Sequence, residues 1–231
     1  MGKDVIIACD FNSKEETLAF LDQFGERKPF VKIGMELFYS QGPDIIKEIK
    51  KRGHKIFLDL KLHDIPNTVK KAMAALSHLD VDMTNVHAAG GTLMMEKALE
   101  GLTRDDGSHP ILIGVTQLTS TSKEIMNSDI LIPGNPEDVV KTYAKKVQQA
   151  GLAGVVSSPL ESPEIHRVCG NHFITVTPGI RFNDSAKDDQ KRITTPAMAK
   201  KLGSDYIVVG RPITQADDPV AAYERCIREF I

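Results

Sequence analysis

Short runs of β-branched and aliphatic residues alternate with longer amphipathic stretches from one end of the chain to the other. The eight runs are VIIACDF from Val5, FVKIGMEL from Phe30, KIFLDLKL from Lys55, MTNVHA from Met83, ILIGVTQL from Ile111, GVVSS from Gly154, HFITVTPGI from His172 and YIVVGRPI from Tyr206. Each run has the length of a strand, and the stretches between them suit helices. This alternation predicts the α/β class, with a parallel sheet and crossover helices.

Residues typical of helix boundaries fall between the runs. They are Ser13 with Glu16 as a capping box, Pro43 and Pro136 at first helical positions, and Gly53 and Gly151 at C-terminal caps. Eight strands, each followed by a helix, fit a closed (β/α)8 TIM barrel better than a doubly wound, flavodoxin-like sheet, which stays the alternative. We predict one barrel domain over residues 1–231.

Two connections are longer than the others, residues 119–135 and residues 181–194. Both follow strands, so both should lie over the C-terminal mouth of the barrel, where the active sites of such enzymes are found. Long loops at that mouth are candidates for substrate contact, and we expect residues 181–194 to form a lid.

Composition narrows the class of partner. Charged residues make up 26% of the chain and hydrophobic ones 41%, with a formal net charge of -2, so a globular protein is expected without attraction to nucleic acid or an anionic membrane. No apolar run approaches the length of about 20 residues that spans a bilayer. The charge balance therefore predicts a small-molecule substrate. Cys9, Cys169 and Cys226 show no CxxC spacing, which predicts reduced thiols in a cytoplasmic protein.

The third run contains charges where a barrel strand should be apolar. In FLDLKL, alternation places Leu58, Leu60 and Leu62 on one face and Asp59 and Lys61 on the other. If the leucines pack under the helices, the two charges face the barrel interior. An uncompensated ion there would cost several kcal/mol, so both side chains should be paired or functional.

The same parity brings further charges to this mouth. It turns Lys32 inward on the second strand and Asp10 inward at the end of the first, while Asp64 follows the third strand and could face this pocket or a neighbouring subunit. An Asp/Lys alternation would by itself suit a half-exposed antiparallel strand. Parallel barrel strands are covered on both faces, so repeated charges at strand ends favour a functional site.

The seventh and eighth runs end in TPGIR and VVGRPIT, which contain Gly179 with Arg181 and Gly210 with Arg211. Barrels commonly bind phosphate after these two strands, through backbone N–H groups and arginine. Either motif alone would suit ordinary turn chemistry with a solvated charge. Together, at these two strand ends, they predict a phosphate site.

The segment DLKLHDIPNT, from Asp59 to Thr68, resembles the catalytic segment of the orotidine 5′-phosphate decarboxylase family, bacterial type. The resemblance extends along the chain through ACDF near Asp10, FVKIGMELFYSQGP around Lys32, NVHAAGG from Asn85, VTQLTSTS from Val115, TVTPGIR from Thr175 and IVVGRPIT from Ile207. It implies a homodimeric, cofactor-free barrel enzyme that converts orotidine 5′-phosphate (OMP) to UMP and CO2, the last step of de novo UMP biosynthesis.

The resemblance also implies roles for single residues. Lys61 would stabilise and protonate a carbanion at C6 of the pyrimidine, within a charge network completed by Lys32, Asp59 and Asp64, the last from the second subunit. At the ribose, the expected contacts are Asp10 and Lys32, joined by Asp64 and Thr68 of the neighbouring subunit. Thr119 and Ser120 would contact the pyrimidine. The 5′-phosphate would be bound by Gly210, Arg211 and Gln190, with Arg181 nearby.

Three alternatives stay open at this point. The first is a Mg2+-dependent sugar-phosphate decarboxylase or hexulose-phosphate synthase, which shares the D-x-K-x-x-D arrangement. Those relatives resemble this chain but have a metal-binding Glu at the position of Lys32. The ammonium group of Lys32 would repel Mg2+. A non-catalytic barrel would have lost Lys61 or Asp59. A metal hydrolase would need HxH or HExxH spacing, which the seven histidines lack, so His63 and His87 are expected to be packing or loop residues.

Overall fold

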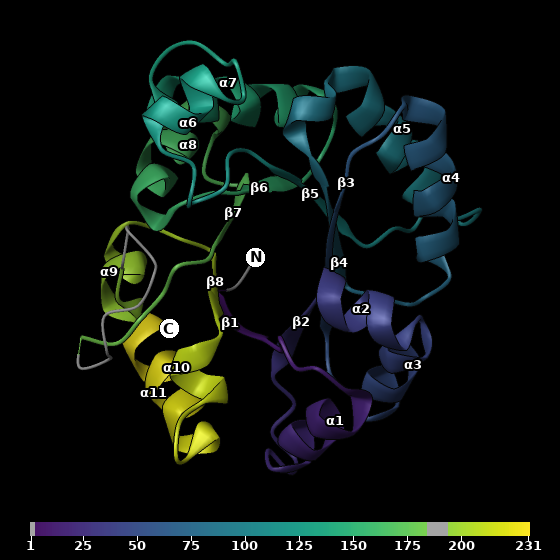
Figure 1. The fold of residues 1–231 in the computed structure, drawn as a ribbon, viewed down its shortest axis with the longest axis vertical. Coiled ribbons are helices and arrows are strands. Elements are labelled where there is room, and N and C mark those ends of the chain that lie inside the picture. The colour runs from purple at the N-terminus through teal and green to yellow at the C-terminus, as the bar shows by residue number, and fades with distance from the viewer. Residues whose placement is uncertain (1–2, 184–193) are drawn as a thin grey trace.

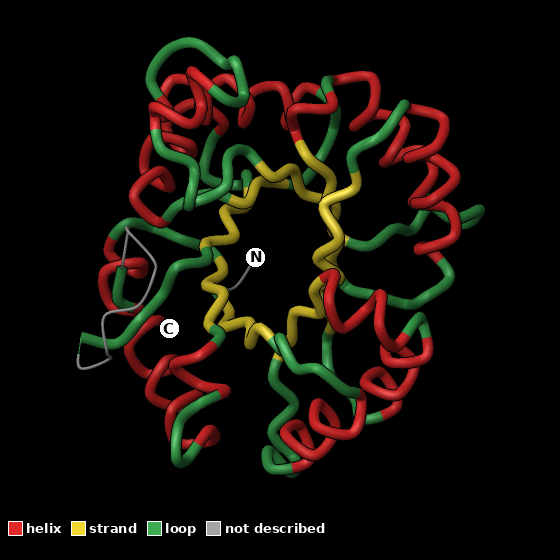
Figure 2. Tube along the Cα trace, in the orientation of Figure 1, coloured by secondary structure: helices red, strands yellow, loops and turns green. Residues whose placement is uncertain are grey.

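The computed structural model describes residues 3–183 and 194–231, in which a ring of strands is enclosed by helices (Figures 1 and 2). The strands of this part of the chain are β1 (Asp4–Ala8), β2 (Phe30–Gly34), β3 (Ile56–Leu62), β4 (Met83–His87), β5 (Ile111–Val115), β6 (Gly154–Val156), β7 (Ile174–Thr177) and β8 (Tyr206–Val209). They pair in sequence order, all parallel, and β8 closes on β1. The predicted (β/α)8 barrel is confirmed, and the doubly wound sheet is excluded.

The helices lie outside the ring (Figure 2); those before β8 connect successive strands, and α10 and α11 follow β8. They are α1 (Lys14–Asp22), α2 (Met35–Gln41), α3 (Asp44–Lys51), α4 (Pro66–Ser77), η1 (Ala88–Gly90), α5 (Thr92–Leu102), α6 (Lys123–Ser128), α7 (Pro136–Gln149), η2 (Pro159–Glu161), α8 (Ser162–Cys169), α9 (Pro196–Lys201), α10 (Arg211–Thr214) and α11 (Pro219–Phe230). No helix within the described ranges is long and apolar enough to cross a membrane.

The predicted helix boundaries are confirmed except at the capping box, of which only half forms, and at Pro43. Ser13 caps α1 by accepting a hydrogen bond from the Glu16 backbone N–H (3.1 Å), which is one half of the expected capping box. Pro136 begins α7 as predicted, whereas Pro43 lies one position before α3. The residues after the C-caps of α3 and α7 are Gly53 and Gly151, with φ of +85° and +84°. Glycine ends both helices because it adopts positive φ without a steric penalty.

Two layers of apolar side chains hold the barrel together. The inner layer fills the ring with alternate strand residues: Ile6, Ala8, Phe30, Phe57, Met83, Ile113, Ile174, Val176, Tyr206 and Val208. The outer layer contains the other face of each strand and packs against the helices. Leu58 and Leu60 belong to this outer layer, as their alternation predicted.

The charged residues continue the inner columns toward the mouth. Phe30 of β2 lies inside the ring two residues before Lys32, and Phe57 of β3 lies there two residues before Asp59. The closed ring therefore brings charges from neighbouring strands to one end of the barrel, which is the position the alternation predicted.

The two long connections have different outcomes. Residues 119–135 were expected to form a loop, but they contain helix α6, which Ser122 caps by accepting from the Ile125 N–H (3.2 Å). The expected lid over residues 181–194 lies mostly outside the described residues. Its two ends meet, since the Arg181 N–H donates to the Thr194 carbonyl (3.0 Å).

Candidate active site

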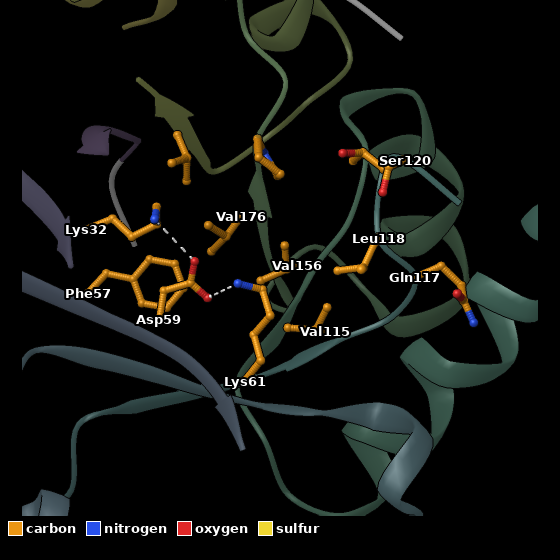
Figure 3. Close-up of a pocket in the computed structure, with 13 residues that line it drawn as sticks. Lys32, Phe57, Asp59, Lys61, Val115, Gln117, Leu118, Ser120, Val156 and Val176 are labelled. Carbon is orange, nitrogen blue, oxygen red and sulfur yellow. Dashed lines mark hydrogen bonds and ion pairs between the residues drawn. The ribbon is translucent and has the colours of Figure 1, made fainter. Parts of the chain in front are cut away.

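Four side chains of alternating charge form a continuous network at the mouth of the barrel. Lys32 Nζ lies 3.1 Å from Asp10 Oδ1 and 3.4 Å from Asp59 Oδ2. The other oxygen of Asp59 accepts a hydrogen bond from Lys61 Nζ at 2.8 Å. Figure 3 shows the Asp59 carboxylate between the two lysine ammonium groups. The structure thus brings together the four charges that the strand parity directed to this mouth.

Burial makes this network electrostatically strong. The side chains of Lys32 and Asp59 are only 12% and 10% exposed, whereas Asp10 is open to solvent. Burial by itself would raise the pKa of Asp59, but Lys32, Lys61 and the hydrogen bonds from Lys61 and Asn85 hold that pKa below its ordinary value. Burial likewise opposes the charge on Lys32, yet Asp59 and Asp10 keep its pKa raised. Both groups are therefore charged at neutral pH.

The backbone of Lys61 has an unusual conformation. Its φ is +51°, in the left-handed region that non-glycine residues rarely adopt. The pairing of β3 with β4 shifts register between Leu58 and Leu62, so a bulge interrupts the ladder at this residue. Strained backbone of this kind collects at functional sites, where it aims a side chain.

A cavity of about 220 Å³ adjoins the network and opens between the ends of the strands (Figure 3). Its lining comprises Lys32, Phe57, Asp59, Lys61, Val115, Gln117, Leu118, Thr119, Ser120, Val156, Val176, Pro178 and Val208. One wall carries the two ammonium groups and a carboxylate, and much of the rest is apolar. Such a pocket can hold a flat ring while charged groups act on one edge of it.

Two predicted site residues lie apart from this cavity within the same chain. Asp64 and Thr68 are both exposed, on the segment that leads from β3 into α4. Asp64 Oδ1 accepts a hydrogen bond from the Ile65 backbone N–H at 2.6 Å. Neither residue lines the cavity, so their role in a neighbouring subunit stays a prediction.

The predicted phosphate residues lie at the ends of β7 and β8. Gly210 is the residue between β8 and α10, and Arg211 is the first residue of that helix. Arg181 is buried and donates from Nη1 to the Ile180 carbonyl at 2.9 Å. Gln190 lies outside the described residues. Arg181, Gly210 and Arg211 do not appear in the cavity lining, so a phosphate at this position would extend the site beyond the cavity.

Sequence reasoning missed several residues of the site. Asn85 of β4 is fully buried and contacts both Lys61 and Asp59. Its position in the alternation of β4, two residues after the inner Met83, could have identified it as an inward polar residue. The apolar wall of Val115, Val156 and Val176 carries no such signal, because valine packs on both faces of these strands, outward as at Val31 and inward as at Val176.

Histidines and cysteines play no part in the cavity lining. His63 and His87 stack on each other, with ring centroids 5.6 Å apart, which agrees with the packing role expected for them. The three cysteines are free, and burial raises the pKa of both Cys9 and Cys226 to about 12, so these two thiols stay protonated. Residues 3–183 and 194–231 bring together no group of three or more His, Cys, Asp or Glu that could hold a metal ion.

Comparison with known proteins agrees with this geometry. Residues 3–226 match the model of the "Orotidine 5'-phosphate decarboxylase / HUMPS family". The orotidine 5'-phosphate decarboxylase of a Geobacillus species is 54% identical to this chain, over 100% of this chain and 98% of the relative. That of Bacillus cytotoxicus is 55% identical, over 97% of this chain and 95% of the relative. The crystal structure of the orotidine 5'-phosphate decarboxylase from Lactobacillus acidophilus, 44% identical over 99% of both chains, superposes with a TM-score of 0.88. The chain therefore belongs to the orotidine 5′-phosphate decarboxylase / HUMPS family.

Proposed function

We propose that this chain decarboxylates OMP to UMP and CO2 without a cofactor, and that Lys61 stabilises and protonates the C6 carbanion. The observation that carries the proposal is the Lys61–Asp59–Lys32 network beside a cavity able to hold a pyrimidine. The names of the 54–55% identical relatives support the same substrate.

The reaction requires what Lys61 can supply. When the bond between C6 and the carboxylate carbon breaks, CO2 departs and the electron pair stays on C6, where the ring offers no good resonance sink. An ammonium beside C6 stabilises that charge and then donates its proton to C6. The resulting neutral amine of Lys61 regains a proton from solvent, through its partly exposed side chain. Atoms and charge then balance.

Asp59 holds Lys61 in place for this step. Its Oδ1 lies 2.8 Å from Lys61 Nζ, so the carboxylate orients the ammonium group. Near the substrate carboxylate, Asp59 would also repel the ground state and release that repulsion as CO2 leaves. Orientation is the role that the hydrogen bond supports directly.

The remaining predicted residues bind the substrate in this proposal. Thr119 and Ser120 lie on the cavity wall, where hydroxyl groups can bond to the polar edge of a pyrimidine. Asp10 and Lys32, which lie at the mouth, would bind the ribose hydroxyls. Gly210 and Arg211, with Arg181 and Gln190, would take the 5′-phosphate by backbone N–H and guanidinium groups.

A second copy of the chain would complete the site. Asp64 and Thr68 are exposed next to Ile65, whose apolar side chain is 66% exposed. An exposed isoleucine between two polar residues suits an interface that buries it. In the homodimer we propose, Asp64 and Thr68 reach the ribose in the partner's site.

The position of Lys32 argues against the Mg2+-dependent enzyme of the same family. Its Nζ lies between the carboxylates of Asp10 and Asp59. A divalent cation bound by those carboxylates would meet the ammonium at close range, and like charges repel strongly in a buried site.

Hydrogen exchange into the product tests the carbanion mechanism. If Lys61 protonates C6, the reverse step removes the C6 proton of UMP, so UMP with the protein in D2O should gain deuterium at C6 by NMR. Lys61→Ala should abolish this exchange. Decarboxylation by the native protein with no C6 exchange above background would contradict protonation by Lys61.

A further inference from the structure

Asn85 joins the two residues at the centre of the network. It lies on β4, is fully buried, and pairs in register with Ile113 of β5, which faces the barrel interior. Its Oδ1 accepts a hydrogen bond from the Lys61 backbone N–H at 2.8 Å. Its Nδ2 donates to Asp59 Oδ1 at 2.7 Å. One side chain thus contacts both the backbone of Lys61 and the carboxylate that binds its ammonium.

Each of the two bonds meets a specific requirement of β3. The bulge between Leu58 and Leu62 takes the Lys61 N–H out of the regular β3–β4 ladder, and an N–H left without a partner at this partly buried position would be destabilising. The Asn85 carbonyl oxygen replaces the missing ladder partner. It thereby stabilises the left-handed conformation at Lys61, where φ is +51°.

The second bond fixes the Asp59 carboxylate. Asp59 Oδ1 receives both Lys61 Nζ and Asn85 Nδ2, while Oδ2 faces Lys32. Because the Asn85 donor is neutral and comes from a different strand, it fixes the carboxylate without adding a competing charge. Rotation of the carboxylate away from Lys61 would break this bond.

We propose that Asn85 is a positioning residue, which holds the β3 bulge and the Asp59 carboxylate so that the Lys61 ammonium points at the reacting carbon. The inference rests on the proposed decarboxylase function for its kinetic test. It assigns Asn85 no contact with substrate. An amide suits this position because it offers one acceptor and one neutral donor at any pH.

Asn85→Leu tests the proposal against a matched control. The leucine keeps the approximate volume and removes both bonds. Thr84→Val is the control, because Thr84 is equally buried on β4 and donates to the Leu58 carbonyl of β3 (3.0 Å) from the outer face, away from the network. We expect kcat of N85L on OMP to fall roughly 100-fold with KM changed less than threefold, as displacement by about 1 Å can cost that factor. T84V should keep kcat within threefold.

Asn85→Asp provides a second variant of nearly identical shape. Its added carboxyl would lie at hydrogen-bond distance from Asp59, and two carboxylates that close share a proton. The other charged groups facing the position are Lys61 of β3 and, beyond Asp59, Lys32 of β2. Protonated, the new carboxyl can accept from the Lys61 N–H and donate to Asp59 as the amide does. We expect kcat of N85D to recover as pH falls and to drop as pH rises, in contrast to the native protein over the same range.

A substrate-independent readout separates this inference from the proposed function. The 13C NMR titration of the Asp59 carboxyl should show a higher pKa in N85L than in T84V, because the donor from Asn85 is lost. An inactive native protein would refute the decarboxylase, while this titration would still test the Asn85 bond. N85L with kcat within threefold of T84V, N85D without the pH-dependent recovery, or an unchanged Asp59 titration would each overturn the positioning role.

Discussion

At the scale of single residues, Lys61 combines an unfavourable backbone conformation with the chemistry proposed for it. An L-residue in the left-handed region is destabilised by about 1–2 kcal/mol relative to its ordinary conformations. The φ of +51° at Lys61 therefore reduces stability while it aims the side chain along the mouth of the barrel. Asn85 and Asp59 hold the residue in that conformation.

Glycine at this position should reveal the strain. Both Lys61→Gly and Lys61→Ala remove the ammonium, but only glycine adopts positive φ freely, so we expect K61G to be more stable than K61A by about 1 kcal/mol. Urea unfolding at neutral pH measures the difference. At Lys55, an exposed position just before β3 without positive φ, glycine should instead be the less stable of the pair. If the glycine and alanine variants had the same order of stability at both positions, that result would contradict the strain at Lys61.

At the scale of elements, helices α4 and α5 approach each other unusually closely. A Cβ added to Gly101 of α5 would lie 2.1 Å from the Lys70 carbonyl oxygen of α4, a backbone atom that cannot move aside alone. Gly101→Ala should therefore lower the free energy of unfolding by about 1–3 kcal/mol, despite the higher helix propensity of alanine. Glu96→Ala, on the exposed face of α5, should change it by less than about 0.5 kcal/mol. Equal stability of the two variants would refute the close approach.

A pH-dependent contact joins α8 to the start of β8. His166 Nε2 lies 3.1 Å from Asp205 Oδ2, which also accepts from the Thr175 N–H and hydroxyl. The bond to Asp205 raises the pKa of His166. Burial opposes the charge on Asp205, but the bonds from His166 and Thr175 keep its pKa lowered.

The sign of each shift sets the pH window of this contact. The raised pKa of His166 gives stability that is present below about pH 6.5 and is lost as pH rises through the folded pKa. The lowered pKa of Asp205 gives stability that is present above about pH 4 and is lost as pH falls further. His166→Gln should therefore reduce stability more at pH 5.5 than at pH 8.5 in urea titrations. His172→Gln, at an exposed histidine, is the control, and a pH-independent effect of H166Q would count against the ion pair.

The elements also show which features the sequence could predict. All eight strands were identifiable, because each is an apolar run covered on both faces, and the inward charges followed from strict alternation along β2 and β3. Helix α6 was missed because six residues are too short to show helical periodicity. The bulge at Lys61 was also missed, since its conformation depends on Asn85 of the next strand, a contact that local pattern does not encode.

At the scale of the whole molecule, closure of the ring determines the site. Lys32 of β2 and Asp59 of β3 meet Asp10, which follows β1, because the three strands are neighbours whose ends lie at one mouth. Asp64 and Thr68 are exposed and do not line the cavity of their own chain, so the role proposed for them requires a second copy of the chain. The homodimer and a single domain over residues 1–231 stay predictions.

Complementation between inactive variants tests the shared site. In a homodimer, a K61A subunit paired with an Asp64→Ala subunit would contain one site with both Lys61 and Asp64 intact. A mixture of the two inactive variants should then recover activity, up to about a quarter of the native value with random pairing and independent sites. No recovery, with subunit exchange verified by differently tagged chains, would place Asp64 outside the partner's site.

The central claim is that this barrel decarboxylates OMP with Lys61 and without a metal. Its most direct test is to follow the loss of orotate absorbance after addition of the purified protein to OMP in excess EDTA, with Lys61→Ala measured in parallel. We expect rapid conversion to UMP by the native protein and a loss of at least about 1000-fold in K61A, because the variant lacks both the stabilising charge and the proton donor. No conversion by the native protein, or equal conversion by K61A, would contradict it.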